Sequence, residues 1–166
     1  ILYDTSARDH ILAGVNILTN ATHGISTSGA GAITIVGEAA NFAGADGNAF
    51  GIYLNASPAS SVLNIAAQNG NVSLTGTASG GIIGFNSLGV EAIFGVNVST
   101  TSGDISVLGY GGATSTGNGN TGIELVGNSP LTPHLLSTSG DISLTGYGGA
   151  GAASRGVLFF GPTLFQ

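Results

Sequence analysis

Apolar and polar residues alternate with a period of two in short stretches of this chain, and one such stretch recurs four times. It reads glycine, any residue, aliphatic, hydroxyl, aliphatic, any residue, glycine, and we call it the repeat phrase. Its copies are GAITIVG from Gly31, GNVSLTG from Gly70, GDISVLG from Gly103 and GDISLTG from Gly140, with starts 39, 33 and 37 residues apart. Strict alternation predicts strands with one buried face, and self-similarity at this period indicates a stacked repeat array.

Two further alternating segments accompany the repeat phrase. A glycine–aliphatic segment recurs at intervals of 37, 38, 33 and 34 residues, starting at Gly14, Gly51, Gly89, Gly122 and Gly156. A weaker segment lies between it and the phrase, around Ile25, Ile65, Val98 and Leu136. Each repeat therefore predicts three short strands followed by a glycine-rich stretch.

Strands arranged in this way predict an all-β fold, the right-handed parallel β-helix or β-solenoid, in which neighbouring turns bury each other's apolar faces. We expect about four to five repeats of 33–39 residues with three short strands each, in a single array over residues 1–166. The expected inward columns are Ile33, Val72, Ile105 and Ile142; Ile35, Leu74, Val107 and Leu144; and Val15, Ile52, Val90, Ile123 and Val157. Thr34, Ser73, Ser106 and Ser143 would point outward.

Two ways of stacking the repeats remain open. One repeat can form one rung, with stretches such as 110–121 and 147–155 as side loops, or two rungs of about 18 residues each. The first is favoured because the glycine-rich stretches carry little period-two signal. The glycines that bracket the strands predict sharp corners, since glycine takes positive φ angles without a side-chain clash.

Composition narrows the class of protein. The 30 glycines and the complete absence of lysine disfavour helical repeats, and a net charge of −6 with only two arginines leaves no basic stripe for nucleic acid. No cysteine is present, so disulfides and cysteine-ligated metals are excluded. No apolar run approaches the roughly 20 residues of a membrane helix. Because the chain opens on Ile1 without a signal-peptide pattern, we expect an excerpt or processed segment of a longer chain.

The phrases TSGDISVLGYGG and STSGDISLTGYGG, which alternate with GIELVG and GVLFFG, carry a family resemblance. They resemble the repeat regions of large bacterial surface and secreted proteins of the filamentous haemagglutinin and autotransporter adhesin type. The resemblance implies an exported β-helical protein at the bacterial cell surface or outside the cell, serving as an adhesin, stalk or biofilm matrix component. It covers nearly the whole chain, but it assigns no individual binding residue.

Two pairs of residues at equivalent repeat positions are candidate sites. Asp104 and Asp141 would lie about 5 Å apart on adjacent rungs, where two carboxylates could hold a cation weakly. The favoured interpretation is that each caps its turn through the side chain, as Asn71 would. Tyr110 and Tyr147 could stack as an outward platform for a sugar ring or a partner, or shield the edge of a glycine corner.

The sequence predicts no catalytic residue, cofactor or metal site. The carboxylates are dispersed, and His10, His23 and His134 show no recurrent spacing, so we interpret the histidines as solvated loop residues. We therefore expect a non-enzymatic structural and adhesive fibre or stalk segment that continues in the same polypeptide or self-associates end to end, with cell-surface glycans or matrix as further partners. The alternative is a carbohydrate-binding or carbohydrate-active β-helix of the lyase or hydrolase kind.

Overall fold

The computed structural model describes residues 10–39, 47–57, 60–78, 86–113 and 119–166. Within these ranges the regular structure is entirely β-strand, arranged in three parallel sheets. Sheet A consists of β1 (His10–Thr19), β4 (Gly47–Ala56), β7 (Ser87–Phe94), β10 (Ile123–Val126) and β13 (Val157–Phe160). Sheet B consists of β2 (Thr22–Thr27), β5 (Val62–Ala67), β8 (Val96–Thr100), β11 (His134–Ser137) and β14 (Leu164–Phe165). Sheet C consists of β3 (Ile33–Glu38), β6 (Val72–Thr77), β9 (Ile105–Tyr110) and β12 (Ile142–Tyr147).

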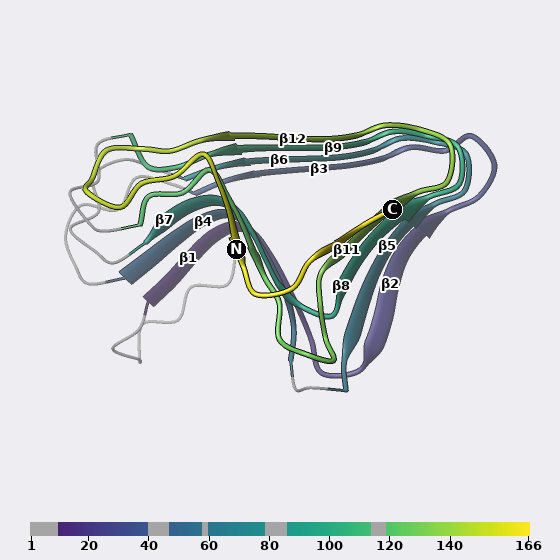
Figure 1. Cartoon of the computed structure of the whole chain (residues 1–166), viewed down its shortest axis with the longest axis horizontal. Helices are drawn as coiled ribbons and strands as arrows, with labels where there is room; N and C mark the ends of the chain where they lie inside the picture. The colour runs from purple at the N-terminus through teal and green to yellow at the C-terminus, as the bar shows by residue number, and fades with distance from the viewer. Residues whose placement is uncertain (1–9, 40–46, 58–59, 79–85, 114–118) are drawn as a thin grey trace.

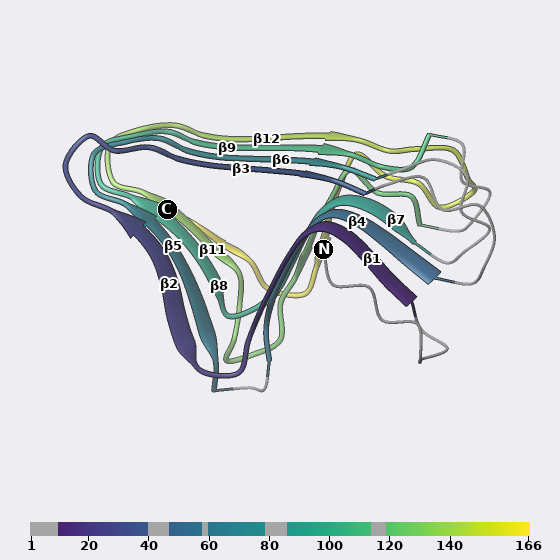
Figure 2. The same ribbon diagram turned by 180° about the vertical axis from the view of Figure 1, so that it is seen from behind.

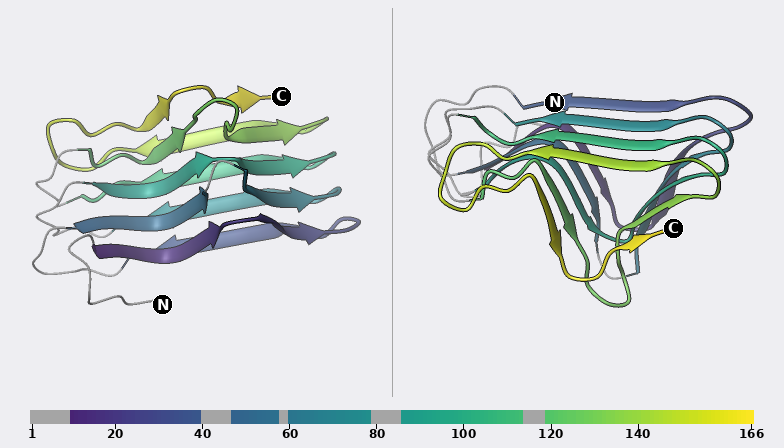
Figure 3. Two further views of the ribbon diagram at one scale, coloured as in Figure 1. Left: turned by 90° about the horizontal axis from the view of Figure 1, so that it is seen from below. Right: turned by 45° about the horizontal axis from the view of Figure 1, so that its top comes forward.

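The chain visits the sheets in the order A, B, C, and each strand pairs with the strand three places later. One repeat is therefore one rung, and the alternative with two rungs per repeat is wrong. The rungs lie on top of one another in Figure 3. The C-terminal rungs are nearest the viewer in Figure 1 and the N-terminal rung in Figure 2, and the path turns anticlockwise toward the viewer in Figure 1, so the coil is right-handed.

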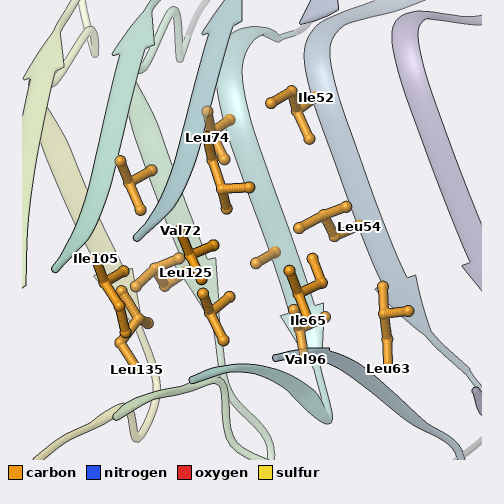
Figure 4. Packing of buried hydrophobic residues seen from close by; sticks show 14 of the residues in the cluster. Ile52, Leu54, Leu63, Ile65, Val72, Leu74, Val96, Ile105, Leu125 and Leu135 are labelled. Atoms are coloured by element: carbon orange, nitrogen blue, oxygen red, sulfur yellow. The ribbon is translucent and has the colours of Figure 1, made fainter. Parts of the chain in front are cut away.

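The predicted inward columns are confirmed in full. Ile33, Val72, Ile105 and Ile142 pair in register through sheet C, and Val15, Ile52, Val90, Ile123 and Val157 do so through sheet A. Their side chains meet those of sheet B inside the triangle formed by the three sheets, as Figure 4 shows for Ile52, Ile65 and Val72. No rung closes this core alone, so contacts between rungs stabilise the fold.

The expected column through sheet B is wrong at its last member. Val98 pairs with Leu135, and Leu136 pairs with Ser99. Because side chains alternate across a strand, this shift of one residue buries Leu135 and turns Leu136 outward. The register places Ser137 beside Thr100, where both hydroxyls make the same corner hydrogen bonds.

The phrase glycines serve close packing, and the expectation that they provide positive φ angles is wrong. Positive φ occurs in the described glycines only at Gly29, Gly119, Gly151 and Gly161, none of them a phrase glycine. A Cβ atom on Gly76 or Gly109 would lie less than 3.0 Å from backbone atoms of the facing glycine of sheet A. We call this contact the glycine seam; it joins Gly37, Gly76, Gly109 and Gly146 of sheet C to Gly51, Gly89, Gly122 and Gly156 of sheet A.

Sheet A is folded along the glycine seam. Its first three strands rise toward sheet C, bend at the seam and descend, as Figures 1 and 2 show. Ile52 and Leu54 point into the triangular core, while Phe50, Tyr53 and Leu88 form a separate buried cluster. We call the side of sheet A that carries this second cluster the concave face.

Candidate functional site

The corner between sheets B and C is held by hydroxyl groups that link successive rungs. Thr100 Oγ1 donates a hydrogen bond to the Gly70 carbonyl of the rung below, at 2.9 Å, and accepts the N–H of Gly103 in its own rung, at 3.1 Å. Ser137 makes the equivalent bonds to the Gly103 carbonyl and the Gly140 N–H, at 2.8 and 2.9 Å. The hydroxyl therefore replaces the backbone hydrogen bonds that a tight corner cannot make.

Asp104 and Asp141 form part of a second ladder beside this corner. Asn71 Oδ1 accepts the backbone N–H of Asp104, and Asp104 Oδ1 accepts the backbone N–H of Asp141, both at 2.9 Å. The favoured capping role thus takes a different form, because each side chain caps the next rung instead of its own turn. The residues that the structure describes contain no group of three or more histidine, aspartate or glutamate side chains that could hold a metal ion.

Tyr110 and Tyr147 stack as predicted. Their ring centroids lie 5.0 Å apart and their planes differ by 7°. Thr77 precedes them in the same outward column of sheet C, and Tyr147 is the last member. The two rings cover each other's inner faces, so the outer face of Tyr147, whose side chain is 53% exposed, is the larger free aromatic surface.

An open hollow of about 600 Å³ adjoins the tyrosines. It is lined by Thr77, Ala78, Tyr110, Gly111, Ala113, Tyr147, Gly148, Gly149 and Ala150. Stacked phenol rings beside glycine backbone offer an apolar surface edged with hydroxyl, N–H and carbonyl groups, which suits a sugar ring or a flat polar segment.

Sequence reasoning missed a pair of stacked carboxylates on the concave face. Tyr53, Glu91 and Glu124 are register neighbours on β4, β7 and β10, so their side chains share one face of sheet A. Glu91 is only 9% exposed. Phe50 stacks on Tyr53 with ring centroids 4.7 Å apart, and Leu88 packs against both.

The carboxyl group of Glu91 is strongly perturbed. Burial, and secondly the charge of Glu124, raise the pKa of Glu91 to about 8. Burial also raises the pKa of Glu124, which the positive charge of Arg155 partly offsets. Burial raises the pKa of the Tyr53 hydroxyl, against the hydrogen bond that Asn55 Nδ2 donates to it at 2.8 Å. At neutral pH Glu91 is therefore mostly protonated.

A raised carboxyl pKa is typical of general acids, but the position of Glu91 does not favour catalysis. A side chain with so little exposed surface does not reach a polymeric substrate. The pair stores a proton within the fold, and its chemistry is that of pH-dependent stability. The phrases GVEA and GIEL already placed both glutamates at one repeat position; the fold of sheet A, which buries Glu91, had no sequence signal.

The described histidines are not brought together. His23 lies on β2 and His134 on β11, and β5 and β8 lie between these strands in sheet B. His134 Nε2 is 2.7 Å from Thr132 Oγ1, while His23 is exposed. His10 begins β1 in sheet A. Both described rings therefore belong to strands, and the expectation that they lie in loops is wrong.

The parallel sheets, residue columns and inter-rung ladders together define a β-solenoid repeat protein. No family model, no curated protein and no solved structure matches this chain. In the part of the chain that the structure describes, no helix is long and apolar enough to cross a membrane.

Proposed function

We propose that this chain is a structural and adhesive β-solenoid, a fibre or stalk segment of a bacterial surface protein. One observation carries the proposal: equivalent residues pair from rung to rung through backbone and side-chain ladders. A unit that contacts only its neighbours can be repeated without redesign, so such a fold extends by simple addition of rungs. Length is the property that a stalk or fibre needs.

The extracellular setting of the proposal is supported by the repeat phrases, which resemble those of exported bacterial adhesins. The lack of cysteine and the low charge are compatible with that setting. Self-association at the ends is supported by the apolar side chains exposed there. Leu18, Ile25 and Val36 are exposed on the first rung, and Phe159, Phe160, Leu164 and Phe165 on the last.

Rung addition tests the structural proposal. We expect tandem duplication of residues 103–139 to lengthen the particle by about 4.8 Å per added rung at constant cross-section, because each rung adds one strand spacing. Small-angle scattering of variants with one, two and three extra rungs measures both dimensions. A 37-residue glycine–serine insertion of equal mass after Ala113 is the control. Growth in cross-section, or the same behaviour from both insertions, would contradict the proposal.

A second candidate, carbohydrate binding, is favoured by one feature, the exposed face of Tyr147 above the hollow of about 600 Å³. If it is correct, a panel of bacterial and host polysaccharides contains a ligand whose affinity falls in the Tyr147→Ala variant and is retained in Tyr147→Phe. A panel that yields no such ligand removes this candidate and leaves the structural one untouched.

A further inference from the structure

The three sheets end at different levels at the C-terminal end of the solenoid. Sheets A and B have five strands each and sheet C has four, so β12 lies one rung below β13 and β14. Phe159 and Phe165, on β13 and β14, meet edge to face with ring centroids 5.4 Å apart and join two sides of the fifth rung. The third side, above β12, is open.

The open edge of β12 carries unused pairing capacity. In the lower rungs the N–H groups of Ile33, Val72 and Ile105 each donate to a carbonyl of the rung above, at 2.9 Å. The N–H of Ile142 occupies the same position on the open edge. Ile142 and Leu144 are half-buried, whereas their counterparts in β9 are buried. A further strand would complete both the hydrogen bonds and the apolar contacts.

The end residues of β12 specify what such a strand must contain. Its first residue must be glycine, because each phrase glycine lies directly on the glycine carbonyl below; a Cβ on Gly140 itself would lie less than 3.0 Å from Gly103. The N–H of its second residue would donate to Asp141 Oδ1, as the N–H of Asp141 does to Asp104. A hydroxyl three residues before the glycine would donate to the Gly140 carbonyl, as Ser137 does to Gly103.

The other end of β12 adds an aromatic requirement. Tyr147 presents a free ring face, and a tyrosine placed after the second phrase glycine would stack on it as Tyr147 stacks on Tyr110. That glycine would lie beside the seam, where there is no room for a side chain. The complementary segment is therefore serine or threonine, two residues, then Gly-Asx-aliphatic-hydroxyl-aliphatic-any-Gly-Tyr.

A second folded copy does not fill this position. If β1 of a second copy stacked on β13, and β2 on β14, then β3 would lie two strand spacings above β12 and leave one strand position empty. Moreover, β3 follows Ala32 and ends in Glu38, where the complementary segment has Asx and tyrosine. An extended segment fits where a folded end does not.

We propose that the open edge of β12 is a strand-acceptor site for an extended segment that carries the repeat phrase with its flanking hydroxyl and tyrosine. The inference rests on the proposed function, since it identifies the partner through which the solenoid grows. Specificity comes from the glycine carbonyls, Asp141 and Tyr147, and affinity from the backbone hydrogen bonds and from Ile142 and Leu144.

The test uses a fluorescent peptide with the sequence of residues 137–149, titrated against the 166-residue chain by anisotropy. We expect saturation at one peptide per chain and increased protection from hydrogen exchange at the amides of β12. Replacement of the first peptide glycine by alanine abolishes binding. A scrambled peptide that binds equally well, or protection confined to β13, β14 or β3, would overturn the proposal.

The Asp141 ladder provides a directional control. Asp141→Ala in the protein should weaken binding about 10-fold, because the incoming N–H loses a charged acceptor. Asp141→Asn should retain binding, because Asn71 performs the same task in the second rung. Replacement of the peptide's own aspartate by alanine should leave binding unchanged, because that side chain faces the next free level. Equal weakening by the protein and peptide changes contradicts the ladder.

Failure of this inference is distinguishable from failure of the proposed function. If duplicated rungs lengthen the particle but no peptide binds, the solenoid is structural and its β12 edge does not accept strands in trans. If duplicated rungs do not lengthen the particle, the proposed function fails whatever the peptide does.

Discussion

The triangular core and the concave face of sheet A are both buried, yet they are built in opposite ways. In the core, each column carries the same kind of residue in every rung, such as Ile33, Val72, Ile105 and Ile142. On the concave face, one column runs Asn16, Tyr53, Glu91, Glu124 and Leu158. The two regions are the opposite sides of the same strands and share the glycine seam.

This contrast separates what the repeat maintains from what it leaves free to vary. A core column that changed from rung to rung would leave cavities or clashes, so uniform aliphatic residues are required. The concave face is packed only locally, by the cluster of Phe50, Tyr53 and Leu88. It therefore accommodates polar and charged residues, and with them a dependence on pH that the core does not have.

Disruption of the seam should have the largest effect, because it separates both regions at once. Gly109→Ala places a Cβ less than 3.0 Å from the Gly122 carbonyl, so sheets A and C must move apart. We expect a loss of more than about 4 kcal/mol in the free energy of unfolding, measured with urea, or failure to fold. Gly29→Ala is the control: its φ of +61° strains alanine, but its surroundings are open, so the cost is about 1–2 kcal/mol. Similar losses in both variants would contradict the close-packing role.

The concave face should make stability fall as pH rises. The folded pKa of Glu91, about 8, lies above its ordinary value of 4.5, so the folded state binds the proton more tightly. This stabilisation is complete below pH 4.5 and is lost progressively up to about pH 8, a loss of up to about 5 kcal/mol. Urea unfolding at several pH values measures it.

Two variants identify the cause of that slope. Glu91→Gln should remove it, because glutamine does not titrate. Glu124→Gln should reduce it without removing it, since burial is the larger cause and the neighbouring charge the smaller. Tyr53 and Arg155 also act on these carboxyl groups and remain in both variants. A slope that persists in Glu91→Gln must come from another group and would contradict the assignment.

The same contrast explains what the sequence could predict. The core columns were predictable because period-two alternation and repeat spacing both act along the chain. The shift at Leu136 was not, because two adjacent hydroxyl-rich alignments looked alike and the corner bonds of Ser137 chose between them. The seam and the burial of Glu91 depend on how two distant strands approach each other. The sequence marks those positions as glycine or glutamate without giving the reason.

Truncation within the core should cost less than the seam and be independent of pH. Ile65 is fully buried among the core columns, and Ile65→Ala should lower the free energy of unfolding by about 2–5 kcal/mol. Val36, on the outer side of sheet C, is 65% exposed, and Val36→Ala should change it by less than about 0.5 kcal/mol. Comparable effects of both changes would mean that the triangle is not the main source of stability.

The smallest expected effect concerns a column that belongs to neither region. Tyr110 and Tyr147 repeat as the core does but face outward, at 38% and 53% exposure. In a double-mutant cycle with leucine at each position, we expect a coupling of about 0.5–1.5 kcal/mol in the free energy of unfolding. Since Leu108 and Thr145 also pair between β9 and β12, a cycle at that pair serves as the matched control and should give less. A tyrosine coupling no larger than the control would leave the rings free for a ligand, whereas the expected coupling means that any ligand of Tyr147 binds its outer face.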